Sequence, residues 1–226
     1  MTVSADNSTI SKLAISKLST SDDNFAQTLS DLIAWDMVSD TDVEDAVIAI
    51  LRQVKAQGDQ ALIDLTNRFD RRQVEEISQL VISQEQLQQA LESIDTETRT
   101  ALEIAAERIR DYHNHQEQPS WRYQEADGTV LGQQITPLDR VGIYVPGGKA
   151  SYPSSVLMNC IPARVAGVGE VIMMVPAPDG ELSPMVLAAA AIAGVDQVFT
   201  VGGAQAIAAL AYGTETVPKV DKIVGP

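Results

Sequence analysis

The chain has 226 residues, 45% of them hydrophobic, and a formal net charge of −15. This length suits one large domain or two small ones and is enough to bury a sizeable core. The acidic balance argues against nucleic acid and membrane surfaces as partners, because phosphate binding needs clustered Lys and Arg. No apolar run approaches the roughly 20 residues that span a bilayer, and the first residues do not resemble a signal peptide.

The single cysteine, Cys160, excludes a disulfide within the chain and fits a reducing compartment. It lies in the apolar stretch VLMNCIPA, where nothing nearby would lower the pKa of the thiol. We therefore interpret Cys160 as a buried, unreactive thiol.

The composition changes near Arg140. Of the 31 Asp and Glu residues, 25 lie at or before residue 140, whereas 11 of the 14 glycines lie after it. We therefore predict a boundary there. Residues 1–22, rich in Ser, Thr and Asp, are expected to form a loose arm, residues 23–140 a mainly helical part, and residues 141–226 a second kind of structure.

Apolar residues at helical spacing predict helices between residues 41 and 113. Capping boxes, Thr41 with Glu44 and Ser83 with Gln86, are expected to begin two of them. Gly58 is a plausible end for the first, QLVIS at 79–83 is a strand candidate, and the last helix runs from about Thr96 to His113. The expected apolar faces carry Val43, Val47, Ile50, Leu51, Val54, Leu62, Leu65, Phe69, Leu87, Ala90, Leu91, Ile94, Leu102, Ala105, Ala106, Ile109 and Tyr112.

The two histidines, His113 and His115, form a His-x-His pair. On a strand this spacing would put both rings on one side, as a metal site requires, whereas near a helix end the rings diverge. No third His and no nearby Cys completes a site. We interpret both as surface histidines at a helix C-terminus.

After Arg140 the chain alternates between short apolar strands and helices, which predicts a parallel sheet covered by helices. Ser183 and Pro184 indicate a helix start, and Gly194 indicates its end. The predicted strands are 141–145, 170–175, 197–201 and 222–225, and the predicted helices are 154–167, 183–193 and 203–211. In such sheets ligands bind at the carboxyl ends of the strands.

Two of these ends carry Gly-Gly turns: Gly147 and Gly148 in YVPGGKASYPSS, and Gly202 and Gly203 in VGGAQAIAAL. Glycine permits close approach of a ligand, and free backbone N–H groups at a helix start suit a pyrophosphate. The alternative is that the glycines only make tight turns. Neither turn is G-x-G-x-x-G or a P-loop, so each turn alone is a weak signal. Two such turns at equivalent edges of one sheet leave nucleotide binding and tight turns as equal alternatives.

Tyr144 and Gln205 are the polar side chains that these turns would bring to a ligand. Tyr144 offers a flat ring with a polar tip at the end of a strand, and the amide of Gln205 both donates and accepts hydrogen bonds. Either side chain could instead cap local backbone.

The stretches RVGIYVPGGKASYPSSVLMNCIPARVAGV (140–168) and VFTVGGAQAIAALAYGTETVPKVDKIVGP (198–226) closely resemble histidinol dehydrogenase. The resemblance extends more loosely through KAQGDQALIDLTNRFD (55–70) to about residue 40. It implies an α/β protein in which a helical region precedes an incomplete Rossmann-like parallel-sheet domain, an aldehyde-dehydrogenase-like architecture. Residues 141–226 would then be the cofactor-binding domain.

The same resemblance implies a function. Members of the family are cytoplasmic homodimers that oxidise L-histidinol to L-histidine in histidine biosynthesis, using NAD and a bound zinc ion. Tyr144 and Gln205 match NAD-contacting residues of the family, and Gly147, Gly148, Gly202 and Gly203 are expected to help to hold the cofactor.

In the family the second motif continues with Gly-Asn and then about as much chain again. The zinc ligands and the acid–base residues lie in that continuation, so we assign no catalytic and no metal-binding residue within this chain. We expect the chain to be an N-terminal half that is inactive by itself. Two alternatives remain open: a non-catalytic nucleotide-binding module, and a fragment that mainly offers an edge for dimerisation.

Overall fold

The structure is a computed structural model that describes residues 17–33, 41–147 and 152–225. It divides into two compact units, Met1–Glu44 and Asp45–Pro226. The first unit contains helix α1, Phe25–Ile33, in which no residue is buried. Of the predicted arm 1–22, residues 1–16 lie outside the described part, and residues 17–22 form turns without a helix or strand.

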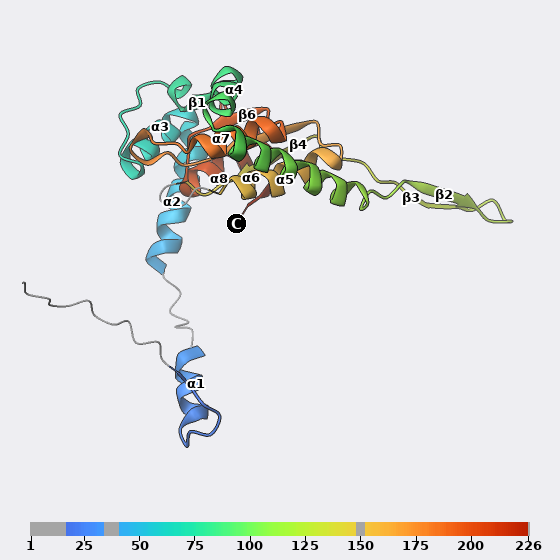
Figure 1. Cartoon of the computed structure of the whole chain (residues 1–226), viewed down its shortest axis with the longest axis horizontal. Coiled ribbons are helices and arrows are strands. Elements are labelled where there is room, and N and C mark those ends of the chain that lie inside the picture. Colours follow the sequence, from blue (N-terminus) through green and yellow to red (C-terminus); the bar gives the residue numbers. More distant parts are fainter. Residues whose placement is uncertain (1–16, 34–40, 148–151, 226) are drawn as a thin grey trace, which may run out of the picture. The chain divides into compact units, whose positions relative to one another are not determined.

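The second unit holds all the strands and most of the helices of the described residues (Figure 1), and α2 begins before the boundary between the units. The helices are α2 Thr41–Gln57, α3 Asp59–Phe69, η1 Ile77–Leu80, α4 Gln84–Ser93, α5 Thr96–Asn114, α6 Pro153–Val165, η2 Pro178–Gly180, α7 Pro184–Ala193 and α8 Gly203–Tyr212. The strands are β1 Val81–Ile82, β2 Trp121–Gln124, β3 Val130–Gln133, β4 Arg140–Tyr144, β5 Glu170–Met174, β6 Gln197–Phe199 and β7 Lys222–Val224.

Several predicted helix ends are confirmed. At the start of α4, the Gln86 backbone N–H donates to Ser83 Oγ and the Ser83 N–H donates to Gln86 Oε1, which is the predicted capping box. Gly194 ends α7 with a left-handed φ of 76°, a conformation that glycine adopts without strain. Ser183 precedes α7 as predicted, but its side chain makes no capping hydrogen bond. The side chain of Thr41, and with it the other predicted box, lies outside the described residues.

Five strands form one sheet in the order β1-β6-β5-β4-β7. The pairs β6–β5, β5–β4 and β4–β7 are parallel, and only β1 pairs antiparallel, with β6. In register, Tyr144 at the end of β4 lies opposite Met174 at the end of β5, and Met174 lies opposite Phe199. The predicted mixed α/β class with a parallel sheet is confirmed.

Helices cover both faces of this sheet. Successive residues of a strand point to opposite faces, so alternate residues of β5 pack into two different cores. Val171 and Met173 belong to a core with α4, α5, α6 and α7. Ile172 and Met174 belong to a second core with α2, α3 and α8. Such doubly covered parallel strands read as continuous apolar runs rather than alternating ones, as EVIMM in β5 does.

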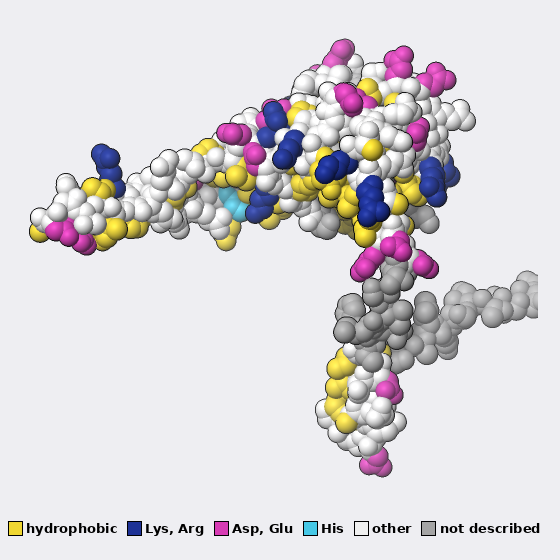
Figure 2. All heavy atoms as spheres, turned by 180° about the vertical axis from the view of Figure 1, so that it is seen from behind, with side chains coloured by type: hydrophobic (Ala, Val, Ile, Leu, Met, Phe, Trp, Pro, Cys, Tyr) yellow, Lys and Arg dark blue, Asp and Glu magenta, His cyan; other side chains and the backbone are white. Residues whose placement is uncertain are grey.

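Strands β2 and β3 form a separate antiparallel hairpin that extends beyond the end of α5, away from the five-stranded sheet (Figure 1). Every residue of both strands is exposed. Hydrophobic side chains are visible along its surface (Figure 2). Trp121 and Tyr123 are exposed, and their rings stack with centroids 6.2 Å apart.

Strand β1 comes from before the predicted boundary near Arg140 and pairs with β6 from after it. The division of the chain into 23–140 and 141–226 stays a prediction. Within the described ranges, no helix combines the length and the apolar character that crossing a membrane requires.

Candidate functional site

The order of the strands creates a switch point beside β4. From β4 the chain proceeds to β5 and then β6 on one side, and it then crosses through α8 to β7 on the other side of β4. The connections in the two directions consequently lie on opposite faces of the sheet, with α6 and α7 on one face and α8 on the other. In open α/β sheets the carboxyl end of such a switch point is the usual place for a ligand.

Tyr144 links the two sides of this point. It is the last residue of β4, half-buried, and its hydroxyl oxygen accepts a hydrogen bond from the Gly203 N–H at 3.2 Å. Gly203 is the first residue of α8, and because the N-cap residue Gly202 has no side chain to cap the helix, Tyr144 supplies the partner of the first N–H. The hydroxyl proton of Tyr144 donates to no described residue, so it remains available to a ligand.

Gly142 makes this contact possible. It shares the α8 side of β4 with Tyr144, and a Cβ added to it would lie 2.7 Å from Cδ1 of Leu210. Leu210 is fully buried in α8. A larger residue at position 142 would therefore force Leu210, and with it the packing of α8 against β4, to shift.

The glycines after β4 and β6 both pack against Pro176, which follows the intervening strand β5. A Cβ on Gly147 would lie 2.0 Å from the Pro176 carbonyl oxygen, and one on Gly202 would lie 2.5 Å from Pro176 Cβ. Gly203 has a φ of +62°, which favours glycine on backbone grounds alone. These positions thus need glycine for tight packing, while Gly148 lies outside the described residues.

Gln205 is buried in the first turn of α8 with 2% of its surface exposed. Its side-chain amide makes no hydrogen bond to any described residue. Its Oε1 atom would lie 2.9 Å from a Cβ added to Gly203, which places the amide next to the turn. The enclosed side-chain atoms without a partner among the described residues are Thr66 Oγ1 and Asp70 Oδ2, so the Gln205 amide is not sealed in the core and could meet a bound molecule at the turn.

An open hollow of about 450 Å³ lies at the switch point. Its size is within the range of about 300–1,000 Å³ that is usual for small-molecule sites. It is lined by Tyr144, Asn159, Ile207, Ile223, Val224 and Gly225. The sequence indicated Tyr144, but Asn159 and Ile207 carried no signal, because their place depends on which strand lies beside β4.

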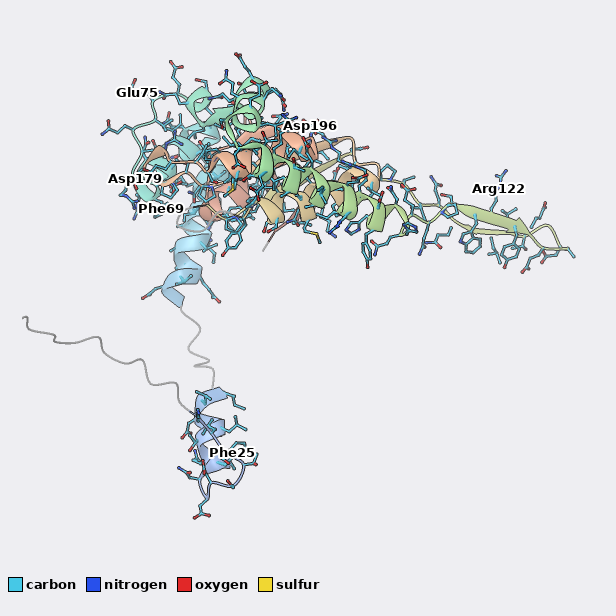
Figure 3. The ribbon with its side chains drawn as sticks, viewed as in Figure 1. Phe25, Phe69, Glu75, Arg122, Asp179 and Asp196 are labelled. Carbon is cyan, nitrogen blue, oxygen red and sulfur yellow. The ribbon has the colours of Figure 1, made fainter. Side chains whose placement is uncertain are left out.

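Neighbouring loops hold the β6–α8 turn in place. The Arg72 guanidinium donates to Thr200 Oγ1 at 2.8 Å, and that hydroxyl donates to the Leu80 carbonyl oxygen at 3.2 Å. The Asp179 N–H, in the loop after β5, donates to the Asp70 carbonyl oxygen at 2.8 Å. Figure 3 shows Asp179 beside Phe69, the last residue of α3.

The remaining candidates lie elsewhere. His113 and His115 are at the end of α5, where their Nδ1 atoms contact Gln116 Oε1 and the Asp111 carbonyl oxygen, both at 2.7 Å. Cys160 is buried in the core, and burial raises the pKa of its thiol to about 12. Within the described part of the chain, no group of three His, Cys, Asp or Glu side chains could hold a metal ion.

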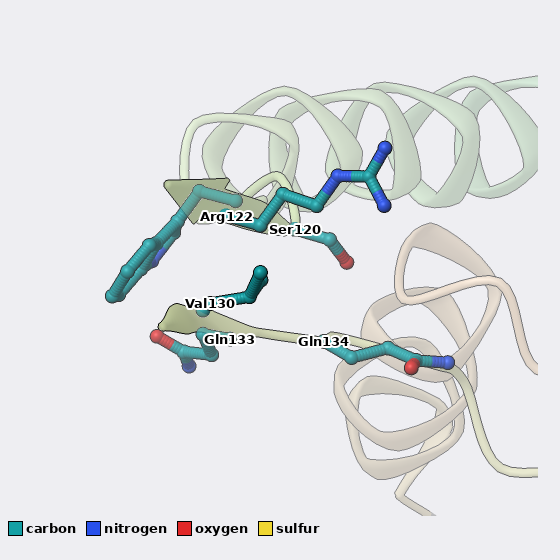
Figure 4. Close-up of a pocket in the computed structure, with 7 residues that line it drawn as sticks. Ser120, Arg122, Val130, Gln133 and Gln134 are labelled. Atoms are coloured by element: carbon teal, nitrogen blue, oxygen red, sulfur yellow. The ribbon is translucent and has the colours of Figure 1, made fainter. Parts of the chain in front are cut away.

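Another hollow, of about 490 Å³, lies on the β2–β3 hairpin between Arg122, Val130 and Gln134 (Figure 4). Only exposed strand and loop residues line it, and it holds none of the residues that the motifs indicate. We do not regard it as the candidate site.

The donor set at the switch point fits a dinucleotide. The N–H groups that follow Gly203 in the first turn of α8 suit a phosphate, the Gln205 amide offers a donor and an acceptor, and the Tyr144 ring lies beside an apolar hollow. The described residues at the site supply no acid–base pair. The fold defines a doubly wound α/β protein, and its switch point is the candidate place for a small-molecule site.

Comparison with known proteins identifies the family. Residues 35–226 match the family model for histidinol dehydrogenase. The histidinol dehydrogenases of Pseudomonas aeruginosa and Pseudomonas syringae pv. tomato are 60% and 61% identical over 213 residues, which is 94% of this chain and 48% of each of theirs. The chain belongs to the histidinol dehydrogenase family.

A solved structure agrees. The crystal structure of histidinol dehydrogenase from Elizabethkingia anophelis matches with a TM-score of 0.76 and 32% identity, over 81% of this chain and 42% of that one. The chain thus spans about half the length of the curated relatives that it matches.

Proposed function

We propose that this chain provides the NAD-binding part of an enzyme that oxidises L-histidinol to L-histidine in two NAD-dependent steps of histidine biosynthesis. Membership of the histidinol dehydrogenase family supports the reaction. The observation that supports the role of this chain is the contact of Tyr144 with Gly203 at the switch point, beside the unbonded amide of Gln205.

In this proposal Gln205, Tyr144 and the glycine turns share the work of holding the cofactor. The N–H groups at the start of α8 face its phosphate groups, and the glycine turns leave room for close approach. The Gln205 amide and the Tyr144 hydroxyl fix its orientation by hydrogen bonds. Bound NAD supplies the hydride acceptor for the oxidation.

The two oxidations also need a group that takes the alcohol proton and one that polarises the alcohol. We propose that zinc and the acid–base residues of the whole enzyme supply these functions from outside the 226 residues, so that this chain alone binds NAD without turnover. The described residues hold no zinc site, and we assign none of them to that step.

We also propose a cytoplasmic homodimer. Exposed apolar side chains on the hairpin, Trp121, Tyr123 and Val130 among them, favour contact with another chain. This observation equally favours the alternative function, a non-catalytic fragment that binds nucleotide or dimerises. Sedimentation of the chain with and without the double change Trp121→Ser and Tyr123→Ser tests the hairpin's part in association.

The test of the main proposal is NADH formation from histidinol, NAD and zinc. The 226-residue chain is assayed alone and together with the segment of the Pseudomonas aeruginosa enzyme that it does not cover. Turnover only in the mixture supports the proposal. Turnover by the chain alone would contradict the assignment of catalysis elsewhere, and binding without turnover in the mixture would favour the non-catalytic alternative.

A further inference from the structure

Asn159 is the one polar side chain in the switch-point hollow that no motif indicated. It lies in the middle of α6 and is half-buried, and α6 covers the face of the sheet opposite α8. The hollow therefore receives Asn159 from one face and Ile207 from the other.

The hydrogen bond that Asn159 makes within α6 determines which of its side-chain atoms can bind a ligand. Its Nδ2 donates to the Ser155 carbonyl oxygen, one helical turn earlier, at 2.7 Å. A carbonyl only accepts, so this contact places the amide nitrogen toward the helix and leaves Oδ1 as the outward atom. Oδ1 accepts no hydrogen bond from any described residue, which leaves one acceptor at the wall of the hollow.

The rest of the hollow is suited to a flat ring. Ile207, Ile223 and Val224 give it apolar walls, and Tyr144 adds an aromatic ring whose hydroxyl proton is free to donate. No charged side chain lines it. An apolar slot with one donor and one acceptor recognises an uncharged heterocycle by its edge.

We propose that Asn159 Oδ1 accepts a hydrogen bond from the exocyclic amino group of a nitrogen heterocycle of the bound dinucleotide. This inference rests on the proposed function, since it assumes that NAD binds at the switch point. NAD has two such groups, the 6-amino group of adenine and the carboxamide NH2 of nicotinamide. Both present the same chemistry, a flat ring with an amino donor at its edge.

The experiment measures the dissociation constant of NAD for the 226-residue chain by titration calorimetry, without histidinol. Asn159→Ala should weaken NAD binding about fivefold, as the loss of one net hydrogen bond implies. The neighbouring residue Met158, 52% exposed and not in the lining of the hollow, gives the matched control: Met158→Ala should leave the dissociation constant unchanged. Thermal unfolding of each variant shows that the fold is retained.

Two NAD analogues identify the donor. Nicotinamide hypoxanthine dinucleotide lacks the adenine amino group, and 3-acetylpyridine adenine dinucleotide lacks the carboxamide NH2. The fivefold increase in the dissociation constant of Asn159→Ala should disappear with one analogue and persist with the other. The analogue with which it disappears identifies the ring that lies in the hollow.

Other results would overturn the inference. A loss of affinity in Asn159→Ala that persists with both analogues, or no loss of affinity for NAD, rejects the role of Asn159. If Gln205→Ala nevertheless binds NAD more weakly than the unchanged chain, the proposed function still stands. If the unchanged chain binds no NAD, the proposed function fails for this chain and the inference fails with it.

Discussion

The hydroxyl of Tyr144 and the backbone N–H of Gly203 are hydrogen-bonded at 3.2 Å, although 59 residues separate them in the sequence. The bond connects the end of β4 to the start of α8, the two elements on either side of the switch point. It holds the aromatic ring at the edge of the hollow and fixes the position of the first turn of α8. Both features belong to the proposed NAD site.

Removing the Tyr144 hydroxyl therefore tests the site directly. Tyr144→Phe keeps the ring but loses the bond to Gly203, and we expect about fivefold weaker NAD binding with about 1 kcal/mol or less lost in stability. Titration calorimetry and urea unfolding measure the two quantities. Tyr212→Phe, at the exposed last residue of α8, is the control. Equal NAD affinity for Tyr144→Phe and the unchanged chain would remove Tyr144 from the site.

Replacing Gln205 should increase the stability of the chain and weaken its binding of NAD. Its side chain is 2% exposed and its amide makes no hydrogen bond to a described residue, so the amide contributes little to the stability of the folded chain. Replacing it with the similarly shaped Met should raise the free energy of unfolding by about 1 kcal/mol while weakening NAD binding about tenfold. Denaturant unfolding and calorimetry report the two effects. A variant that is less stable and binds NAD normally would mean that Gln205 has a structural role.

Gly142 should be intolerant of a methyl group. In Gly142→Ala the new Cβ would lie 2.7 Å from Leu210 Cδ1, and we expect a loss of about 1–3 kcal/mol from overpacking. NAD binding should weaken as well, because α8 carries Gly203 away from Tyr144. Adding Leu210→Ala should relieve the clash and restore part of the NAD affinity, whereas Leu210→Ala alone only leaves a cavity. A Gly142→Ala variant with unchanged affinity would show that the spacing of β4 and α8 does not control the site.

Cys160 should make stability fall in alkaline solution. Burial raises the pKa of its thiol from 9.0 to about 12, so the folded chain keeps a proton that the unfolded chain releases. The contribution is fully present below pH 9.0 and is lost as the pH rises toward 12, at up to about 1.4 kcal/mol per pH unit. Urea unfolding between pH 8 and pH 10.5 measures the slope. Cys160→Ala should show a shallower decline, and an identical slope in both chains would contradict the assignment.

The sequence predicted the parallel strands and their helices well, because doubly covered strands are short, apolar and regularly spaced. The run EVIMMV predicted β5, and the structure gives Glu170–Met174. The sequence predicted less well the elements that lie at the edge of the sheet or extend beyond the core. QLVIS contributes only Val81 and Ile82 to the sheet. Tyr112, expected on the apolar face of α5, is 65% exposed, because that helix extends past the core toward the hairpin.

Two features were not predicted. Strands β2 and β3 were missed although Trp121 and Tyr123 alternate with polar residues and Asp127-Gly128 marks a turn, because both strands are short and every residue in them is exposed. The place of β7 beside β4 depends on the direction in which the chain crosses the sheet, and spacing alone does not give it. Because that place creates the hollow, Asn159 and Ile207 could not be assigned to a site, whereas Tyr144 and Gln205 could be indicated by their neighbouring turns.

The most direct test of the account is an NMR titration of the isotope-labelled chain with NAD. Uncapped N–H groups at the start of α8 and the ends of β4 and β7 should contact the cofactor. We predict that the largest amide shifts fall on Gly203, Gln205 and Gly225, with little change along the hairpin. Shifts concentrated on the hairpin, or saturating binding that leaves the start of α8 unmoved, would contradict the placement of the cofactor at the switch point.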